Sequence, residues 1–344
     1  MKKKVTFSDI ARYTNFSKTT ISRYFNNPDS LAEESQQKIA EALVALDYKE
    51  NKVARILANG KTEFIGIIAP NFFHQFYSNL INQLLDTYRT HGYKFIVFLG
   101  NDDVETERQY VQELMSYQIE ALIVLSHTMS SYELSQLDIP VVSIEREDEF
   151  ICSVNSSNLS GAVQATKLLH RHGCDVLLHI NNPTDPKIPS YGRIVGFEET
   201  CKRLQVPYEI YYRDFVDHYH DTKQKLLEIF EEIEEKYSHQ KKGIFLSNDT
   251  LANIFLNIAL SHGKRVPEDY ELIGFDNSPI AEQAFLPLTT IAQDTAGIVD
   301  NTMKLLTKQI DHRKGRRAKP VPNTVIEHIL VQSHLVERST TSHP

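Results

Sequence analysis

Four polar side chains near the start of the chain have the types and spacing of a surface that contacts a polyanion. On a helix with about 100° per residue, residues 18–25 place cations and hydroxyls within roughly 140° of the circumference. These side chains are Lys18, Thr19, Ser22 and Arg23. Thr20, Ile21 and Tyr24 fall on the opposite side, where they can be buried. In a DNA major groove, arginine and lysine address guanine, and hydroxyls address bases or phosphates. The face therefore predicts a DNA-reading helix; the alternative is an ordinary polar surface.

The neighbouring residues predict the elements that would position this face. Thr6 caps a first helix, Asn15–Phe16 makes a tight turn, and Ser17 caps the second helix. Asn27–Pro28 ends that helix, because proline cannot continue it. A third amphipathic helix follows, with apolar residues spaced for burial at Ile39, Leu43 and Leu46. The start of the chain therefore predicts a three-helix unit that contains a helix–turn–helix.

The charge is distributed unevenly along the 344 residues. Residues 1–61 hold eleven lysines and arginines against seven aspartates and glutamates, a net charge of +4. The whole chain has a net charge of −8, so the remainder carries −12. A basic head on an acidic body suggests a polyanion-binding module joined to a second, different unit.

From Phe64 onward, short and continuous apolar runs alternate with segments of helical period. Continuous rather than alternating runs are typical of strands buried on both faces of a parallel sheet. The expected strands are 64–69, 95–99, 121–125, 140–144, 175–180, 242–247 and 270–276. The first four form one block and the others a second block. This α/β pattern predicts two lobes with a cleft at the carboxyl ends of the strands.

Several classes of protein are disfavoured by composition. No apolar run approaches the roughly 20 residues of a membrane helix, and the positively charged start lacks the apolar stretch of an export signal. The three cysteines, Cys152, Cys174 and Cys201, form no Cys-x-x-Cys pair. The odd count argues against a disulfide framework or zinc site and fits a reducing cytoplasm.

Enzyme activity is the first rival interpretation. The candidate bases among the 14 histidines are His74, His127, His179 and His218. A lone histidine in a loop or strand is more often structural than catalytic, and the sequence has no nucleophile elbow, zinc-protease, P-loop or dinucleotide-binding motif. We therefore expect no enzyme activity, cofactor or metal.

Several motifs in a fixed order resemble the LacI/GalR family of bacterial transcription regulators. They are the stretch from Val5 to Pro70, "YGRIVGFEE", and "FLSNDTLANIFLNIALSHGKRVPEDYELIGFDNSPIAEQAFLPLTTIAQD". The resemblance implies a lambda-repressor-like helix–turn–helix domain in residues 1–50 and a hinge helix in 51–62. It also implies a two-lobed, periplasmic-binding-protein-like domain in residues 63–340. The first lobe would hold about 63–157 and 292–322, and the second about 158–291 and 323–340.

The resemblance assigns DNA contacts to the head and hinge. The implied residues are Thr6, Ser17, Lys18, Thr19, Ser22, Arg23, Asn26, Ala54 and Leu57. Lys18 and Thr19 occupy positions that set operator choice, while Ser22 would hold a phosphate. Leu57 would be an apolar wedge in the minor groove, and Ala54 would permit close approach. The alternative for Leu57 is a helix-core leucine.

The resemblance also assigns effector contacts to the predicted cleft. The implied residues are Phe76, Tyr77, Arg146, Arg193, Asn248 and Asp276. Aspartate, asparagine and a forked arginine suit sugar hydroxyls, and an aromatic ring suits the apolar face of a pyranose. The alternatives are helix caps at Asn248 and Asp276 and a surface ion pair at Arg193. Lys187, together with Arg146 and Arg193, would suit a phosphorylated sugar.

The combined interpretation is a cytoplasmic repressor of a carbohydrate operon, acting as a homodimer on operator DNA and released by a sugar or sugar phosphate. The tail after Val336 lacks leucine heptads, so a dimer is expected rather than a tetramer. Two alternatives remain open: a global regulator with a protein corepressor, or a sugar-binding receptor without a DNA role. The sequence names neither the sugar nor the operator.

Overall fold

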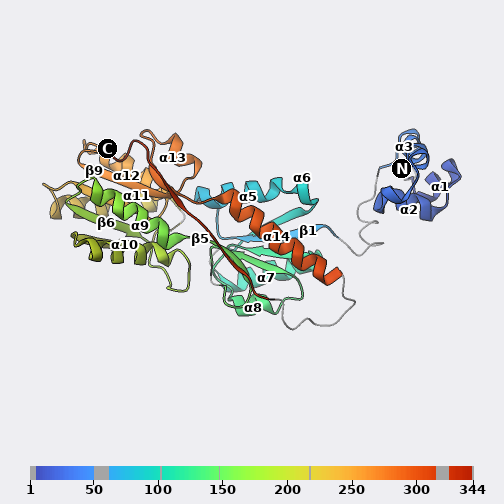
Figure 1. Cartoon of the computed structure of the whole chain (residues 1–344), viewed down its shortest axis with the longest axis horizontal. Coiled ribbons are helices and arrows are strands. Elements are labelled where there is room, and N and C mark those ends of the chain that lie inside the picture. The colour runs from blue at the N-terminus through green and yellow to red at the C-terminus, as the bar shows by residue number, and fades with distance from the viewer. Residues whose placement is uncertain are drawn as a thin grey trace. The chain divides into compact units, whose positions relative to one another are not determined.

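The computed structural model describes residues 5–49, 62–100, 103–146, 148–216, 218–314 and 325–342. The chain divides into two units, Met1–Lys61 and Thr62–Pro344 (Figure 1). We call the first the head and the second the body, and each is described by itself.

The head is a three-helix unit, as predicted. Its elements are α1 (Phe7–Thr14), α2 (Lys18–Asn26), the 3₁₀ turn η1 (Pro28–Ser30) and α3 (Glu33–Ala45). The backbone amide and hydroxyl of Thr6 both donate to the Asp9 carboxylate, at 2.9 and 2.7 Å. Asn15 takes a left-handed conformation at the turn, and Ser17 Oγ accepts from the Thr20 amide at 3.1 Å. The core consists of Ile10, Ile21, Ile39 and Ala42.

The first sheet of the body is parallel throughout, in the order β11-β5-β4-β3-β1-β2. Its strands are β1 (Phe64–Ala69), β2 (Lys94–Leu99), β3 (Ala121–Val124), β4 (Val141–Ile144), β5 (Cys152–Ser156) and β11 (His328–Val331). Two apolar clusters cover its two faces. Side chains from α5 (Gln75–Asp86) and α14 (Thr295–Lys314) form one, and side chains from α7 (Val104–Ser116) and α8 (Ser131–Ser135) form the other. The short helix α6 (Tyr88–His91) follows α5.

The second sheet has the order β12-β10-β9-β8-β6-β7. Its strands are β6 (Val176–Asn181), β7 (Tyr208–Tyr212), β8 (Lys242–Leu246), β9 (Tyr270–Asp276), β10 (Thr289–Ala292) and the antiparallel β12 (His334–Val336). The helices α9 (Asn158–Arg171) and α10 (Tyr191–Leu204) pack on one face. On the other face lie α11 (Tyr219–Lys236), α12 (Asp249–Ser261) and α13 (Pro279–Gln283). Each sheet with its helices is a lobe of the body.

The expected α/β architecture is confirmed. Three helices end at or just before a His-Gly pair, and the glycines, Gly92, Gly173 and Gly263, have φ of 76°, 70° and 74°. Glycine adopts this left-handed conformation without a steric penalty, which is why it ends the helices.

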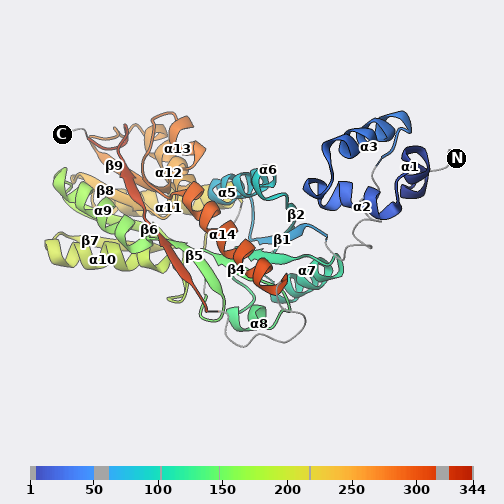
Figure 2. The same cartoon turned by 45° about the vertical axis from the view of Figure 1, so that its right-hand side comes forward.

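Four strands at the passages between the lobes were not indicated by the sequence. Strands β5 and β10 hold serine, threonine or asparagine instead of a continuous apolar run, so the hydrophobic pattern misses them. Strand β11 belongs to the first sheet and β12 to the second. The expectation that 323–340 lies wholly in the second lobe is therefore wrong. Figures 1 and 2 both show this last segment running from one lobe to the other.

None of the helices among the described residues is both long enough and apolar enough to cross a membrane.

Candidate functional site

The exposed face of α2 carries the predicted DNA-contacting side chains. Lys18, Thr19 and Arg23 are exposed and Ser22 is half-buried, while Ile21 is fully buried against α1 and α3. Thr6 and Ser17, at the starts of α1 and α2, are also exposed. The exposed face of α2 is polar and cationic because the apolar side chains of this helix point inward and pack in the core of the head. It has the composition that the major groove requires.

Three predicted DNA contacts receive less support. Asn26 is the last residue of α2, but its side chain lies outside the described part of the structure. Ala54 and Leu57 of the expected hinge also lie outside the described residues. The hinge assignments therefore stay predictions.

In the body, six polar residues form a closed chain of contacts at the crossover between the lobes. We call this set the polar ring: Glu145, Asn158, Arg193, Asp276, Gln293 and Ser156. Asn158 links two charged members of the ring: it donates to Glu145 Oε2 at 2.9 Å and accepts from Arg193 Nε at 2.7 Å. Arg193 Nη2 lies 4.0 Å from Asp276 Oδ1.

Gln293 and Ser156 complete the polar ring on the other side. Gln293 Nε2 donates to Asp276 Oδ1 at 2.6 Å, and Ser156 Oγ donates to Gln293 Oε1 at 2.5 Å. The Ser156 amide donates to Glu145 Oε1. Ser156 ends β5, and Gln293 directly follows β10. The polar ring therefore includes two of the three points where the chain passes between the lobes, and the third lies between β11 and β12.

The charges in the polar ring are buried and depend on each other. Arg193 and Asp276 are 8% and 7% exposed, so their attraction is weakly screened. The Arg193 guanidinium also lies 3.7 Å from the centre of the Phe275 ring, and its Nη1 donates to the Ser247 carbonyl. Burial raises the pKa of Asp276 above its ordinary value, and Arg193 opposes that rise. Groups held in this way can exchange their partners for ligand hydroxyls at small cost.

The other predicted effector residues have different surroundings. Phe76 is buried in the core of the first lobe and meets Tyr77 edge to face at 5.4 Å, so it does not present an open stacking surface. Arg146 is 1% exposed, and its Nη2 donates to the Met129 carbonyl. Asn248 caps α12, accepting from the Leu251 amide at 2.9 Å. For Phe76, Arg146 and Asn248 the structure supports a structural role, whereas Arg193 and Asp276 are brought together.

Sequence reasoning did not single out Asn158, Gln293 or Ser156. Ser156 ends β5, Gln293 directly follows β10, and Asn158 begins the helix after β5, so all three lie where ligands of such sheets bind. The signal was missed because β5 and β10 were not recognised as strands. Lys187, proposed for phosphate binding, has an exposed side chain in the loop before α10.

The buried histidine that could have acted as a base is a core residue. The His179 ring stacks on Phe245 with 4.7 Å between ring centres, and Nδ1 donates to the Phe245 carbonyl at 2.8 Å. Burial lowers the pKa of His179 to about 4, so the ring is neutral at physiological pH. Among the described residues, no group of three or more His, Cys, Asp or Glu side chains is placed to hold a metal ion.

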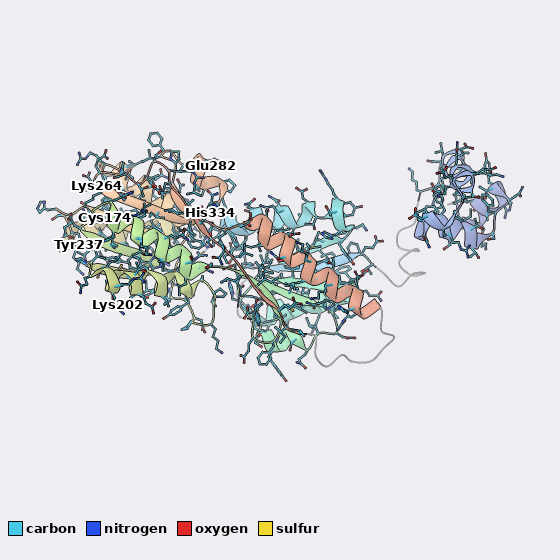
Figure 3. The ribbon with its side chains drawn as sticks, viewed as in Figure 1. Cys174, Lys202, Tyr237, Lys264, Glu282 and His334 are labelled. Carbon is cyan, nitrogen blue, oxygen red and sulfur yellow. The ribbon has the colours of Figure 1, made fainter. Side chains whose placement is uncertain are left out.

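A polar hollow lies in the second lobe, near the start of β8. It is lined by lysines and their neighbours, including Lys241, Lys242 and Lys264. Figure 3 labels Lys264 and Tyr237 at the end of this lobe that faces away from the first lobe. Lys242 and Lys264 pair with Glu234, and Lys241 pairs with Glu271 at 2.7 Å. These ion pairs stabilise the lobe and lie far from the polar ring, so the hollow is not the candidate site.

Two family models match the chain. "Bacterial regulatory proteins, lacI family" matches residues 6–51, and "Periplasmic binding protein-like domain" matches residues 166–341. The first covers the head helices and the second covers most of the second lobe.

Three curated relatives are similar over nearly the whole chain. The ribose operon repressor of Halalkalibacterium halodurans is 30% identical over 338 residues, covering 98% of this chain and 97% of its own length. The sucrose operon repressor of Streptococcus mutans is 31% identical over 310 residues, covering 89% and 93%. Catabolite control protein A of the same species is 27% identical over 310 residues, covering 88% and 91%.

The fold is shared with a solved structure of the lac repressor dimer bound to operator and the anti-inducer ONPF. The TM-score is 0.81 at 20% identity, over 98% of this chain and 99% of that chain. At this identity the likeness concerns the fold, which includes a helix–turn–helix head and two parallel-sheet lobes.

Proposed function

The chain belongs to the LacI family of bacterial transcription regulators, and from this premise we propose that it represses a carbohydrate-utilisation operon and is released from its operator by a sugar. Residues 1–50 bind the operator, 51–62 form the hinge, and 63–340 bind the effector and a second protomer. Two heads of a dimer read the two halves of a pseudo-palindromic site.

One observation carries the proposal: the polar ring places the two predicted effector residues, Arg193 and Asp276, at the crossover between the lobes. The forked guanidinium of Arg193 donates, and the Asp276 carboxylate accepts, so together they suit adjacent hydroxyls of a sugar. Their burial excludes competing water and strengthens each hydrogen bond to a ligand.

The charges favour an uncharged sugar over a sugar phosphate. Of the three cations that would suit a phosphate, Arg146 donates to the Met129 carbonyl and the Lys187 side chain is exposed. Arg193 already faces the Asp276 carboxylate on one side. On its other side Arg193 bonds Asn158, which in turn bonds the Glu145 carboxylate. A phosphate would have to be bound beside the Asp276 and Glu145 carboxylates, which repel it, so its desolvation would bring no matching gain. The similarity to ribose and sucrose operon repressors supports a role at a carbohydrate operon.

Coupling between effector and operator follows from the position of the polar ring. The effector competes for Arg193 and Asp276, and both are linked through Asn158 and Gln293 to residues at the crossovers. A sugar that fits one lobe arrangement better than the other shifts the population toward that arrangement. The shift changes the spacing of the hinge segments in the dimer and releases the operator.

The test is a thermal-shift screen of the full chain against D-ribose, sucrose and other sugars, with their phosphate esters as paired probes. We expect a neutral sugar to raise the melting temperature and its ester to have no effect. The best sugar should then release a DNA fragment from the gene's own promoter region in a mobility-shift assay. Binding of the ester but not of the free sugar would contradict the neutral-effector proposal.

A second candidate function is regulation by a protein corepressor, favoured by the similarity to catabolite control protein A. In that case the screen gives no sugar hit, and operator binding requires a second protein from the same cell. Operator binding by the purified chain alone, lost on addition of a sugar, decides for the operon repressor.

A further inference from the structure

The turn that carries Asp276 has an unusual backbone. Asp276 and Asn277 are consecutive residues with positive φ, 113° and 53°. Asparagine tolerates the left-handed region, but an aspartate at φ 113° lies outside it and stores strain. Strained residues of this kind persist only where neighbouring groups hold them in place. The turn 276–278 therefore needs restraint from outside its own segment.

Asp249 supplies the restraint from inside the lobe. It is fully buried at the start of α12, and its Oδ2 accepts from both the amide and the hydroxyl of Ser278, at 2.8 and 3.0 Å. Its Oδ1 accepts from Thr290 Oγ1 at 2.5 Å. A Cβ at Gly274 would lie 2.3 Å from this Oδ1, so the close approach of α12 to β9 requires glycine there.

Arg338 supplies the restraint from the other side, through the C-terminal segment. Its Nη2 donates to Asn277 Oδ1 at 2.8 Å, and its Nη1 donates to the Leu288 carbonyl at 3.0 Å. The segment itself is fixed, because the neighbouring Thr340 is fully buried and bonds to β9 through the Leu272 amide and carbonyl. Glu282 of α13, labelled in Figure 3, meets the exposed side of the same guanidinium at 3.1 Å.

We propose that Arg338 is a positioning residue for effector binding: it fixes the turn at Asn277 and so orients the Asp276 carboxylate toward Arg193 and the ligand. This deepens the proposed function and rests on it. The Arg338 guanidinium bonds the Asn277 side chain, just after β9, and the Leu288 carbonyl, just before β10, at the same time. It therefore holds these two points at a fixed separation, which the single ammonium of a lysine cannot do. The effector site therefore depends on a residue 62 positions further along the chain, which itself contacts no ligand.

The first test needs no ligand. Hydrogen exchange of the peptide spanning 276–284 is followed by mass spectrometry in the full chain. Arg338→Ala removes the donor, and Asn277→Gly removes the acceptor together with the rest of the side chain. Each should raise the exchange rate about tenfold as the turn opens locally. Arg338→Lys should fall between wild type and Arg338→Ala, and the matched control Glu282→Ala should leave exchange unchanged. Unchanged exchange in both Arg338→Ala and Asn277→Gly would overturn the proposal.

The second test separates positioning from general stability. With D-ribose as the probe, or the best sugar of the screen, Arg338→Ala should weaken binding about tenfold, and Glu282→Ala should not. In an Asp276→Asn background the same Arg338→Ala change should weaken binding by about threefold or less, because Arg338 acts through Asp276. A full tenfold loss in that background would assign Arg338 a purely structural role. If exchange rises as expected but no sugar binds the wild type, the turn restraint is supported and the proposed effector class is contradicted.

Discussion

The two candidate sites of this chain use charge in opposite ways. On the exposed face of α2, Lys18 and Arg23 extend into solvent from one helix and are ready for a partner. In the polar ring, Arg193 and Asp276 come from different elements, are almost fully buried and are already bonded to protein groups. A surface that reads DNA gains affinity from open cations, whereas a site that switches must exchange one set of bonds for another.

The difference also concerns what holds each site in place. The α2 face is set by short-range features: the Ser17 cap, the burial of Ile21 and the helical repeat itself. The polar ring depends on residues from both sheets and on the Asp249 and Arg338 contacts behind it. Substitutions on the α2 face should therefore change operator binding, whereas substitutions in the polar ring should change effector binding or stability. Four predictions test this comparison.

The largest effect is expected for Arg193→Ala. The change leaves Asn158 Oδ1 and the Ser247 carbonyl without their donor and leaves Asp276 buried beside an empty space. Such losses cost about 3 kcal/mol or more, so effector affinity should fall by about 100-fold or more. Calorimetry with the best sugar measures this, and operator binding in the absence of sugar should persist. A folded Arg193→Ala variant that no longer binds operator would contradict the separation of the two sites.

The next effect is a change of operator preference on substitution of Lys18 or Thr19. Each base contact in the major groove contributes about 1–3 kcal/mol of discrimination, so the ratio between two operators should change by roughly 5- to 150-fold. Binding to a library of operator variants measures the ratio. Arg12, also exposed on the head but on α1, provides the control, and Arg12→Ala should leave the ranking of operators unchanged. An equal loss of affinity for every sequence would identify Lys18 as a phosphate contact.

A smaller effect is expected on the pH dependence of stability. Burial raises the pKa of Asp276, so its protonated form stabilises the fold. This contribution is fully present below the ordinary carboxyl pKa of about 4 and is lost as the pH rises toward neutrality. Asp276→Asn keeps Oδ1 as an acceptor for Gln293 but does not titrate. Its melting temperature should fall less between about pH 4 and pH 7 than that of the wild type, by a few degrees. Identical slopes would show that folding does not raise the pKa of Asp276.

The smallest effect is expected for Ser22→Ala on α2. A hydroxyl that contacts a phosphate contributes about 0.5–1.5 kcal/mol without sequence information, so affinity should fall about threefold for all operators alike. The same binding library provides the measurement. A loss confined to particular operators would place Ser22 at a base edge instead.

The sequence was informative wherever neighbours in the chain decide the structure. Caps, the turn at Asn15 and the spacing of Ile10, Ile21 and Ile39 indicated the head correctly. Continuous apolar runs indicated β1, β3, β6, β8 and β9 because both of their faces are buried. The polar strands β5 and β10 gave no such signal. The lobe bounds implied by the resemblance placed 323–340 in one lobe, whereas strand pairing divides this segment after β11.

By itself, the sequence determined the elements and the face of α2, because helix periodicity and capping act over a few residues. Only the tertiary structure decided that Phe76 and Arg146 are buried in the first lobe and that Asn158, Gln293 and Arg338 lie around Arg193 and Asp276. The reason is physical: a buried polar group is stabilised by partners that can lie anywhere along the chain. Its orientation and ionisation are therefore properties of the folded assembly of strands, not of the residues beside it in sequence.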